Sequence, residues 1–185
     1  MQKTAKNEER PTILMANAEF LPHVCELVNE GEMVTIRAKG NSMRPFLESN
    51  RDDIRLKKFE SLRTGDVVLA EIAPGHYVLH RIDHITKPNG MLCKKACSDP
   101  LAHVTLRGDG NIRGTEQCRL RNVRAIACQF VRKGKTWDVD SWRWRTYSVI
   151  WRKLLFFRRI LLAVYRLLWL HEWPQRMVRR KPSII

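Results

Sequence analysis

The chain has 185 residues and a formal net charge of +15, and 44% of its residues are hydrophobic. This length allows one domain of usual size plus an appendage, and this hydrophobic content argues against wholesale disorder. The N-terminal residues are polar, so no signal peptide is expected, and no uncharged apolar run approaches the roughly 18 residues of a membrane span. The positive charge predicts an acidic partner such as nucleic acid or anionic lipid.

The cysteine content disfavours a disulfide framework. There are five cysteines, an odd number in a chain that is not short, and this favours a reducing compartment. Cys93 and Cys97 have the spacing C-x3-C, which leaves a zinc site open as an alternative. Reduced structural thiols are the favoured interpretation, so we predict neither a metal nor any other cofactor.

The elements predicted in chain order describe a mainly β protein. Residues 1–12 are expected to form a disordered arm, and apolar residues at helical spacing predict a helix over 17–30, ended by Gly31. Turns rich in Gly, Pro and Asn then separate short strand-like runs. The predicted strands span 33–38, 53–58, 66–72, 76–85, 103–108 and 123–131. This spacing predicts a small antiparallel β domain within residues 13–135.

Three polar residues of this β region are candidates for chemistry. Ser42 lies in a turn directly after a predicted strand, where a structural turn serine is the alternative. His80 lies between apolar neighbours on one strand face, a setting that favours the neutral imidazole able to accept a hydroxyl proton; a core histidine is its alternative. Asp109 lies in a glycine-bracketed turn, from which it could orient a histidine or form an Asx turn.

The order of these segments resembles the S24/S26 serine peptidases. Four segments, GNSMRPFL (40–47), TGDVVLAEI (64–72), VLHRI (78–82) and RGDGN (107–111), follow the order of that family's boxes. The family includes type I signal peptidases and LexA-like self-cleaving repressors, and the resemblance covers about residues 33–131. It implies a mostly antiparallel β fold of that type. A histidine at position 80 is similar to the branch of signal peptidases that uses a Ser-His pair rather than a lysine base.

The resemblance also implies roles for individual residues. Ser42 is the expected nucleophile, which attacks a peptide carbonyl to form an acyl-enzyme, and His80 is its expected base. An acidic residue assists in the Ser-His branch; we predict Asp109 for this role, with Glu116 as the alternative. The backbone N–H of Ser42 and the Asn41 amide are the expected oxyanion donors.

The tail, residues 141–185, is basic and helical in pattern. Residues 140–185 hold 11 lysines and arginines against two acidic residues. An arginine recurs every seven residues, which predicts a basic stripe along one helix over 145–170; its members are Arg145, Arg152, Arg159 and Arg166. This pattern favours a helix lying flat on an anionic membrane surface, and packing on the β domain or on a partner helix is the alternative.

These predictions together describe a serine endopeptidase that cleaves a leader- or signal-peptide-like substrate. We expect it in the cytoplasm, peripheral on the inner face of the membrane. Two alternatives on the same fold are a weak or inactive module for peptide binding or export, and a self-cleaving regulator. Nucleic acid is disfavoured as a partner because no helix-turn-helix precedes the β region.

Overall fold

The protein is a mainly antiparallel β domain with helices at both ends of the chain. The computed structural model describes residues 17–111, 114–154, 157–165 and 167–168. Its elements are α1 (Asn17–Asn29), β1 (Val34–Arg37), β2 (Asp53–Lys57), β3 (Val67–Ala73), β4 (His76–Thr86), β5 (His103–Arg107), β6 (Glu116–Arg119), η1 (Leu120–Asn122), β7 (Val123–Arg132), β8 (Lys135–Asp138) and α2 (Trp142–Lys153).

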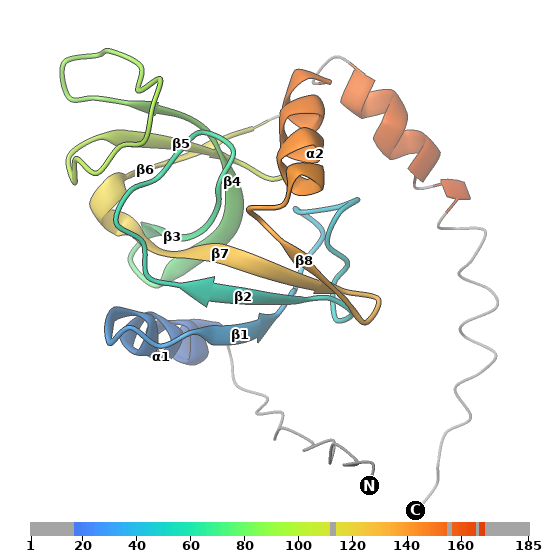
Figure 1. The fold of residues 1–185 in the computed structure, drawn as a ribbon, viewed down its shortest axis with the longest axis horizontal. Coiled ribbons are helices and arrows are strands. Elements are labelled where there is room, and N and C mark those ends of the chain that lie inside the picture. The colour runs from blue at the N-terminus through green and yellow to red at the C-terminus, as the bar shows by residue number, and fades with distance from the viewer. Residues whose placement is uncertain (1–16, 112–113, 155–156, 166, 169–185) are drawn as a thin grey trace, which may run out of the picture.

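All eight strands belong to one sheet, with strand order β1-β2-β7-β3-β4-β5-β6 and with β8 paired to β7. Every pairing is antiparallel. The sheet curls enough for β6 to contact β3. In Figure 1, α1 lies beside β1 and β2 at the bottom of the view, whereas α2 lies at the top.

Two cores form because side chains alternate between the faces of the curled strands. On β3, Val67 and Leu69 belong to a core that also contains α1 and the first turn of α2. Val68 and Ala70 belong to a second core, enclosed by β4, β5 and β6. The central strands β3 and β4 are therefore buried on both faces, and adjacent residues of β4 meet different surroundings.

The sequence predicted much of this architecture. The helix at 17–30 and all six predicted strands are present, with each bound unchanged or shifted by one residue. Two strands were not predicted, β6 and β8, and most of β8 lies between the predicted β domain, 13–135, and the predicted tail, 141–185. The predicted disordered arm, residues 1–12, lies outside the described residues, and the five cysteines are unpaired thiols.

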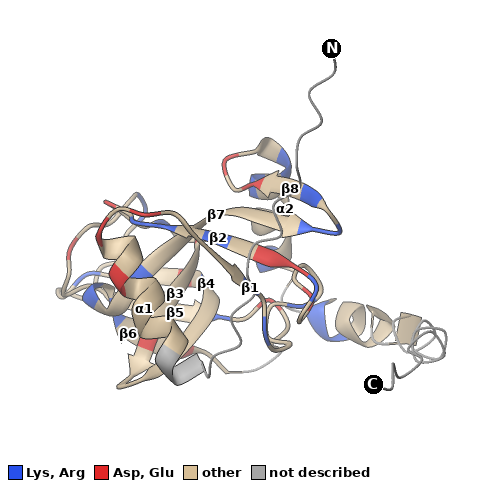
Figure 2. Ribbon diagram, turned by 90° about the horizontal axis from the view of Figure 1, so that it is seen from below, with Lys and Arg blue, Asp and Glu red and all other residues tan. Residues whose placement is uncertain are grey.

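The tail differs from the single helix predicted over 145–170. Helix α2 ends at Lys153, where Leu154 caps it, and the chain is helical again over 157–165 and 167–168. Trp144, Ser148 and Trp151 of α2 are buried against the β domain. Figure 2 shows the second helical segment projecting beyond the sheet, with few charged residues along its length. No helix among the described residues is long and apolar enough to cross a membrane.

Candidate active site

The turn that carries Ser42 is seated against the β5–β6 loop by backbone contacts. The carbonyl oxygen of Ser42 accepts a hydrogen bond of 2.7 Å from the Gly110 N–H. A Cβ atom at Gly108 would lie 2.5 Å from that same oxygen, and one at Gly110 would lie 2.7 Å from the Asn41 oxygen. Both glycines of the RGDGN segment are thus required by close approach of backbone to backbone.

The polar groups of this turn remain available. Ser42 is half-buried and Asn41 is exposed. Within the described part of the chain, the backbone N–H groups of Asn41, Ser42 and Met43 donate to no acceptor, and the Ser42 hydroxyl makes no hydrogen bond. Consecutive N–H groups without intramolecular acceptors can serve an oxyanion.

The buried carboxylate of Asp52 braces the chain beyond the serine. The Glu48 N–H donates to Asp52 at 2.9 Å, and the Arg51 guanidinium donates two hydrogen bonds of 2.7 Å to the same carboxylate. Burial alone raises the pKa of Asp52, but these hydrogen bonds outweigh it and hold the pKa below its usual value. Asp52 is therefore an ionised structural anchor of the 38–52 loop.

His80 is held on the central strand β4, next to the loop that contacts Ser42. It pairs with Val68 of β3. On the other side of β4, Ile82 pairs with Leu106 and Arg81 with Arg107 of β5, and the same register continued by one more residue places His80 beside Gly108. The side chain faces the second core and is only 4% exposed. The strand register thus brings the imidazole to the same loop on which the Ser42 turn rests.

The carboxylate that meets His80 is that of Glu116. The Nδ1 atom of His80 lies 2.9 Å from Glu116 Oε2. Glu116 is the first residue of β6 and pairs with Leu106, so its side chain shares the face of the sheet used by His80. The carboxylate remains in contact with solvent, since 29% of its side chain is exposed.

The surroundings of His80 favour the neutral imidazole. Burial lowers its pKa below the ordinary value of 6.5, and the nearby carboxylate of Glu116 opposes this shift without cancelling it. When Nδ1 donates its hydrogen to Glu116, Nε2 carries the free lone pair of the ring. This is the tautomer that a general base requires.

Asp109, the residue predicted to orient His80, is engaged elsewhere. Both of its carboxylate oxygens accept hydrogen bonds from Arg81, at 2.8 and 2.7 Å. Both side chains are 2% exposed, and they lie on the opposite face of β4 from His80. The structure does not bring Asp109 into hydrogen-bond contact with His80; Glu116, the predicted alternative, takes that place because β6 continues the sheet beyond β5.

Arg81, which the sequence analysis did not single out, makes most of the contacts around Asp109. Its guanidinium also donates to Gly65 O and Ser148 Oγ, at 2.9 and 2.7 Å, and lies over the Trp144 ring. Burial lowers the pKa of Arg81, yet Asp109 more than offsets this and the net shift is upward. An arginine next to the candidate base, within an apolar strand, was the only sequence signal for this cluster.

The predicted site is thus brought together in part. Ser42 and His80 lie against the same β5–β6 loop, and His80 contacts Glu116, but no hydrogen bond joins Ser42 to His80 among the described residues. Such contacts are often loose in the absence of substrate and tighten when it binds. Within the same part of the chain, no three His, Cys, Asp or Glu side chains group as a metal site requires.

The predicted arginine stripe of the tail does not form one surface. Arg145 is exposed and pairs with Asp140, Arg159 is exposed, and Arg166 lies outside the described residues. Arg152 is half-buried, and its Nε atom has no hydrogen-bond partner in the described part of the chain. The break after Lys153 rotates the later residues relative to α2, so a seven-residue repeat no longer keeps to one face.

The outward face of the second helical segment is apolar instead. Its exposed residues are Phe157, Ile160, Leu161, Val164, Leu167 and Leu168. Arg158 and Leu162 point the other way and are 2% and 4% exposed. The Arg158 guanidinium donates to Trp151 O at 3.1 Å and to Asn111 O at 3.4 Å, and the Tyr165 hydroxyl donates to Glu48. The segment therefore contacts the β5–β6 loop through Asn111 and the 38–52 loop, which carries Ser42, through Glu48.

Comparisons of this chain with protein-family models, with curated proteins and with solved structures found no match. The site is therefore interpreted from its own residues and from the resemblance of the four segments quoted above.

Proposed function

We propose that this protein is a serine endopeptidase in which Ser42 is the nucleophile, His80 its base and Glu116 the group that orients the base. The observation that carries the proposal is the 2.9 Å contact between His80 Nδ1 and Glu116 on a buried imidazole. A histidine fixed in this way presents Nε2 on the side where a hydroxyl has to approach. The Ser42 turn, seated on the neighbouring loop, supplies that hydroxyl.

The reaction that these groups support is acyl transfer to serine. As Ser42 Oγ bonds to the peptide carbonyl carbon, its proton passes to His80 Nε2, and Glu116 stabilises the imidazolium that results. The N–H groups of Asn41 and Ser42 have no acceptor in the described structure, and in this mechanism they donate to the oxyanion. His80 then gives its proton to the leaving amine, and water hydrolyses the acyl-enzyme with His80 again as base.

The sequence resemblance supports the same proposal. The four segments that resemble the S24/S26 peptidases contain Ser42, His80 and the loop on which Ser42 rests. A small, mainly antiparallel β domain is compatible with the fold of that family. The Ser-His signal peptidases are the closest in pattern, with a glutamate on β6 here in place of the aspartate they use. A leader- or signal-peptide-like substrate follows from this resemblance.

We also propose that the enzyme works at an anionic membrane surface, through the apolar outward face of residues 157–168. Side chains such as Ile160 and Leu167 are 62% and 68% exposed on that face. Exposed Lys153 and Arg159 flank it, and lipid phosphates complement their charge. This revises the predicted stripe of four arginines into an apolar face with basic flanks.

Labelling with a fluorophosphonate probe tests the peptidase proposal. The full chain should be acylated, and mass spectrometry should place the adduct on Ser42. The matched control is Ser49→Ala, because Ser49 is a hydroxyl of the same loop whose Oγ accepts from the Gly40 N–H at 3.1 Å. Labelling should survive Ser49→Ala and disappear in Ser42→Ala. Equal labelling of the wild type and of Ser42→Ala would rule out Ser42 as the nucleophile.

Flotation with vesicles tests the membrane proposal. The wild type should float with vesicles of phosphatidylglycerol and phosphatidylcholine, and salt should weaken this binding as it screens the basic flanks. The double change Ile160→Glu and Leu167→Glu should abolish flotation. The control Leu27→Glu, at an exposed apolar position of α1, should leave it unchanged. Flotation of the double variant at the wild-type level would overturn the proposal.

A further inference from the structure

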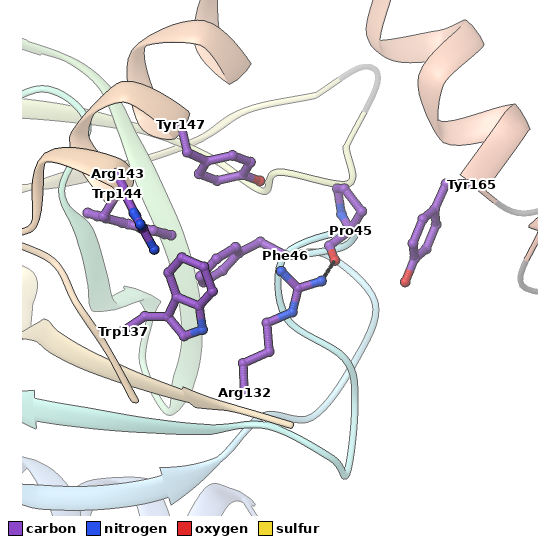
Figure 3. Close-up of a pocket in the computed structure, with 8 residues that line it drawn as sticks. All are labelled: Pro45, Phe46, Arg132, Trp137, Arg143, Trp144, Tyr147 and Tyr165. Carbon is purple, nitrogen blue, oxygen red and sulfur yellow. Dashed lines mark hydrogen bonds between the residues drawn. The ribbon is translucent and has the colours of Figure 1, made fainter. Parts of the chain in front are cut away.

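A second feature near the Ser42 turn is a cleft lined by aromatic rings, shown in Figure 3. It has a volume of about 350 Å³ and lies between the turn, the β7–β8 hairpin, α2 and the second helical segment. Five aromatic side chains line it, namely Phe46, Trp137, Trp144, Tyr147 and Tyr165. Ligand pockets start at roughly 300 Å³, so this cleft has room for one ring and its substituents.

Part of the aromatic lining is fixed by packing. The Phe46 ring lies 4.4 Å from the Trp144 ring and 5.2 Å from the Tyr147 ring, measured between centroids. Phe46 and Trp144 also belong to the first core, with Phe130 against both of them. This buried wall is therefore preorganised, and it holds the partly exposed Tyr147 ring in place for a planar apolar group without a large cost in side-chain ordering.

Two guanidinium groups reach the same cleft without a carboxylate partner. Arg132 donates to Pro45 O at 3.3 Å and lies over the Phe46 ring, as the dashed line in Figure 3 marks. Arg143 is exposed at the start of α2 and contacts the Trp142 ring. Among the described residues neither arginine has a carboxylate within ion-pair distance.

Two carboxylates in this region are bound by other groups. Asp109 is bound by Arg81, and Glu48 is bound by Arg44 and by the Tyr165 hydroxyl. The cleft therefore combines an apolar floor with two guanidinium groups that form no ion pair with the described chain. A guanidinium binds a planar carboxylate through parallel hydrogen bonds, so this charge selects an anion of that shape.

We propose that this cleft binds an aromatic group that carries a carboxylate, with the ring against the partly exposed Trp137 and Tyr147 and the carboxylate on Arg132 and Arg143. The carboxyl-terminal residue of a peptide and a free aryl carboxylate share this chemistry. The site goes beyond the proposed peptidase reaction, because no residue of the Ser42, His80 and Glu116 group lines it. Pro45 and Phe46 nevertheless lie in the same turn as Ser42, so a peptide held here would lie near the nucleophile.

Nuclear magnetic resonance titration of the full chain tests this proposal with four probes. N-acetyl-phenylalanine should bind with a Kd on the order of 1 mM, as expected for a ligand of this size. N-acetyl-phenylalaninamide, which lacks the carboxylate, should bind at least about tenfold more weakly. N-acetyl-alanine should not bind measurably. Phenylpropionate distinguishes the sources: weaker binding than N-acetyl-phenylalanine indicates a peptide end, and tighter binding indicates a free acid.

Variants assign the binding to this cleft. Arg143→Gln, at an exposed position, should weaken the binding of N-acetyl-phenylalanine about tenfold and leave the binding of its amide unchanged. Arg132→Gln should have the same two effects. The control Arg145→Gln lies on the same helix but pairs with Asp140, and it should bind as the wild type does. Ser42→Ala should also bind normally, so failure of the peptidase proposal would be seen separately. Equal binding of the acid and the amide by the wild type would overturn the proposal. Binding of the acid at wild-type strength by both Arg143→Gln and Arg132→Gln would also overturn it.

Discussion

Two adjacent residues of β4 face opposite sides of the sheet, and each meets a carboxylate. Arg81 and Asp109 form a bidentate pair in which both side chains are 2% exposed. His80 and Glu116 share one hydrogen bond, and 29% of the Glu116 side chain reaches solvent. The Arg81–Asp109 cluster also fixes α2 to the sheet, through Ser148 and through the Trp151 indole, which donates to Asp109 O.

The difference separates a structural ion pair from a group able to change its charge. Both carboxylate oxygens of Asp109 already accept hydrogen bonds from Arg81. Protonation of Asp109 would therefore leave the charge of Arg81 buried and unpaired. Around His80 the pKa is lowered by burial, and one ring nitrogen remains for an incoming hydroxyl. We therefore assign stability to the Arg81 face of β4 and chemistry to the His80 face.

The largest expected effect is on the chemical face. Ser42→Ala should lower kcat/KM for a cleavable peptide by about 10⁴-fold or more, because loss of the nucleophile removes the acyl-enzyme route. The free energy of unfolding should change by less than about 1 kcal/mol, since the hydroxyl makes no hydrogen bond in the described structure. Peptide cleavage assays and urea unfolding measure the two quantities. Undiminished cleavage would contradict the assignment.

The next effect is on the structural face. Asp109→Ala should lower the free energy of unfolding by about 3–5 kcal/mol, because it leaves the buried guanidinium of Arg81 without its partner. The matched control is Glu116→Gln, which should cost less than about 1 kcal/mol because that carboxylate is partly exposed. Urea unfolding of both variants gives the comparison. Similar losses in the two variants would show that the faces do not differ in this way.

Glu116→Gln should instead act on the rate. Without the carboxylate the imidazole loses the partner that fixes its tautomer, and kcat/KM should fall by about a hundredfold or more. The measurement is made at a temperature where every variant is folded. An Asp109→Asn protein that remains folded should lose less activity than Glu116→Gln. The reverse order would return the orienting role to Asp109.

The smallest effect is a shift of the pH profile. Activity should rise with pH as His80 loses its proton, with a midpoint below the ordinary histidine value of 6.5 because burial lowers its pKa. Glu116→Gln removes the charge that opposes this shift, so the midpoint should move to still lower pH. The unfolded chain binds this proton more readily than the folded chain, so stability should fall as pH drops below about 6.5. A midpoint that rises in Glu116→Gln would contradict this account.

The sequence predicted the strand of His80 and the turn of Ser42, because the strand has apolar residues on both faces and the turn has glycine and proline around it. Local pattern did not select the two residues for chemistry; the order of the four segments that resemble the S24/S26 peptidases did. Glu116 was only the predicted alternative to Asp109, and β6 (Glu116–Arg119), the strand that carries it, was not predicted because it is short, polar and at the edge of the sheet. Its strand character depends on pairing with β5 rather than on its own residues.

The prediction of one continuous helix in the tail was wrong for a related reason. The prediction from the seven-residue spacing of arginines assumed one uninterrupted helix, whereas α2 ends at Lys153 and the described helical residues that follow it, 157–165 and 167–168, do not continue its phase. The burial of Arg158 and of Trp144 depends on acceptors and rings from distant segments, among them Asn111 and Phe46. Local periodicity cannot report such contacts, so the docked and outward faces of the tail were assigned only from the structure.

The most direct test of the account is the rate at which Ser42 is acylated by a fluorophosphonate in the wild type, in Glu116→Gln and in Asp109→Asn, each verified as folded. We predict a slow reaction in Glu116→Gln that loses most of the wild-type rate at neutral pH, and a rate in Asp109→Asn close to that of the wild type. Acylation of Glu116→Gln at the wild-type rate, with Asp109→Asn strongly impaired, would contradict the separation of the two faces of β4.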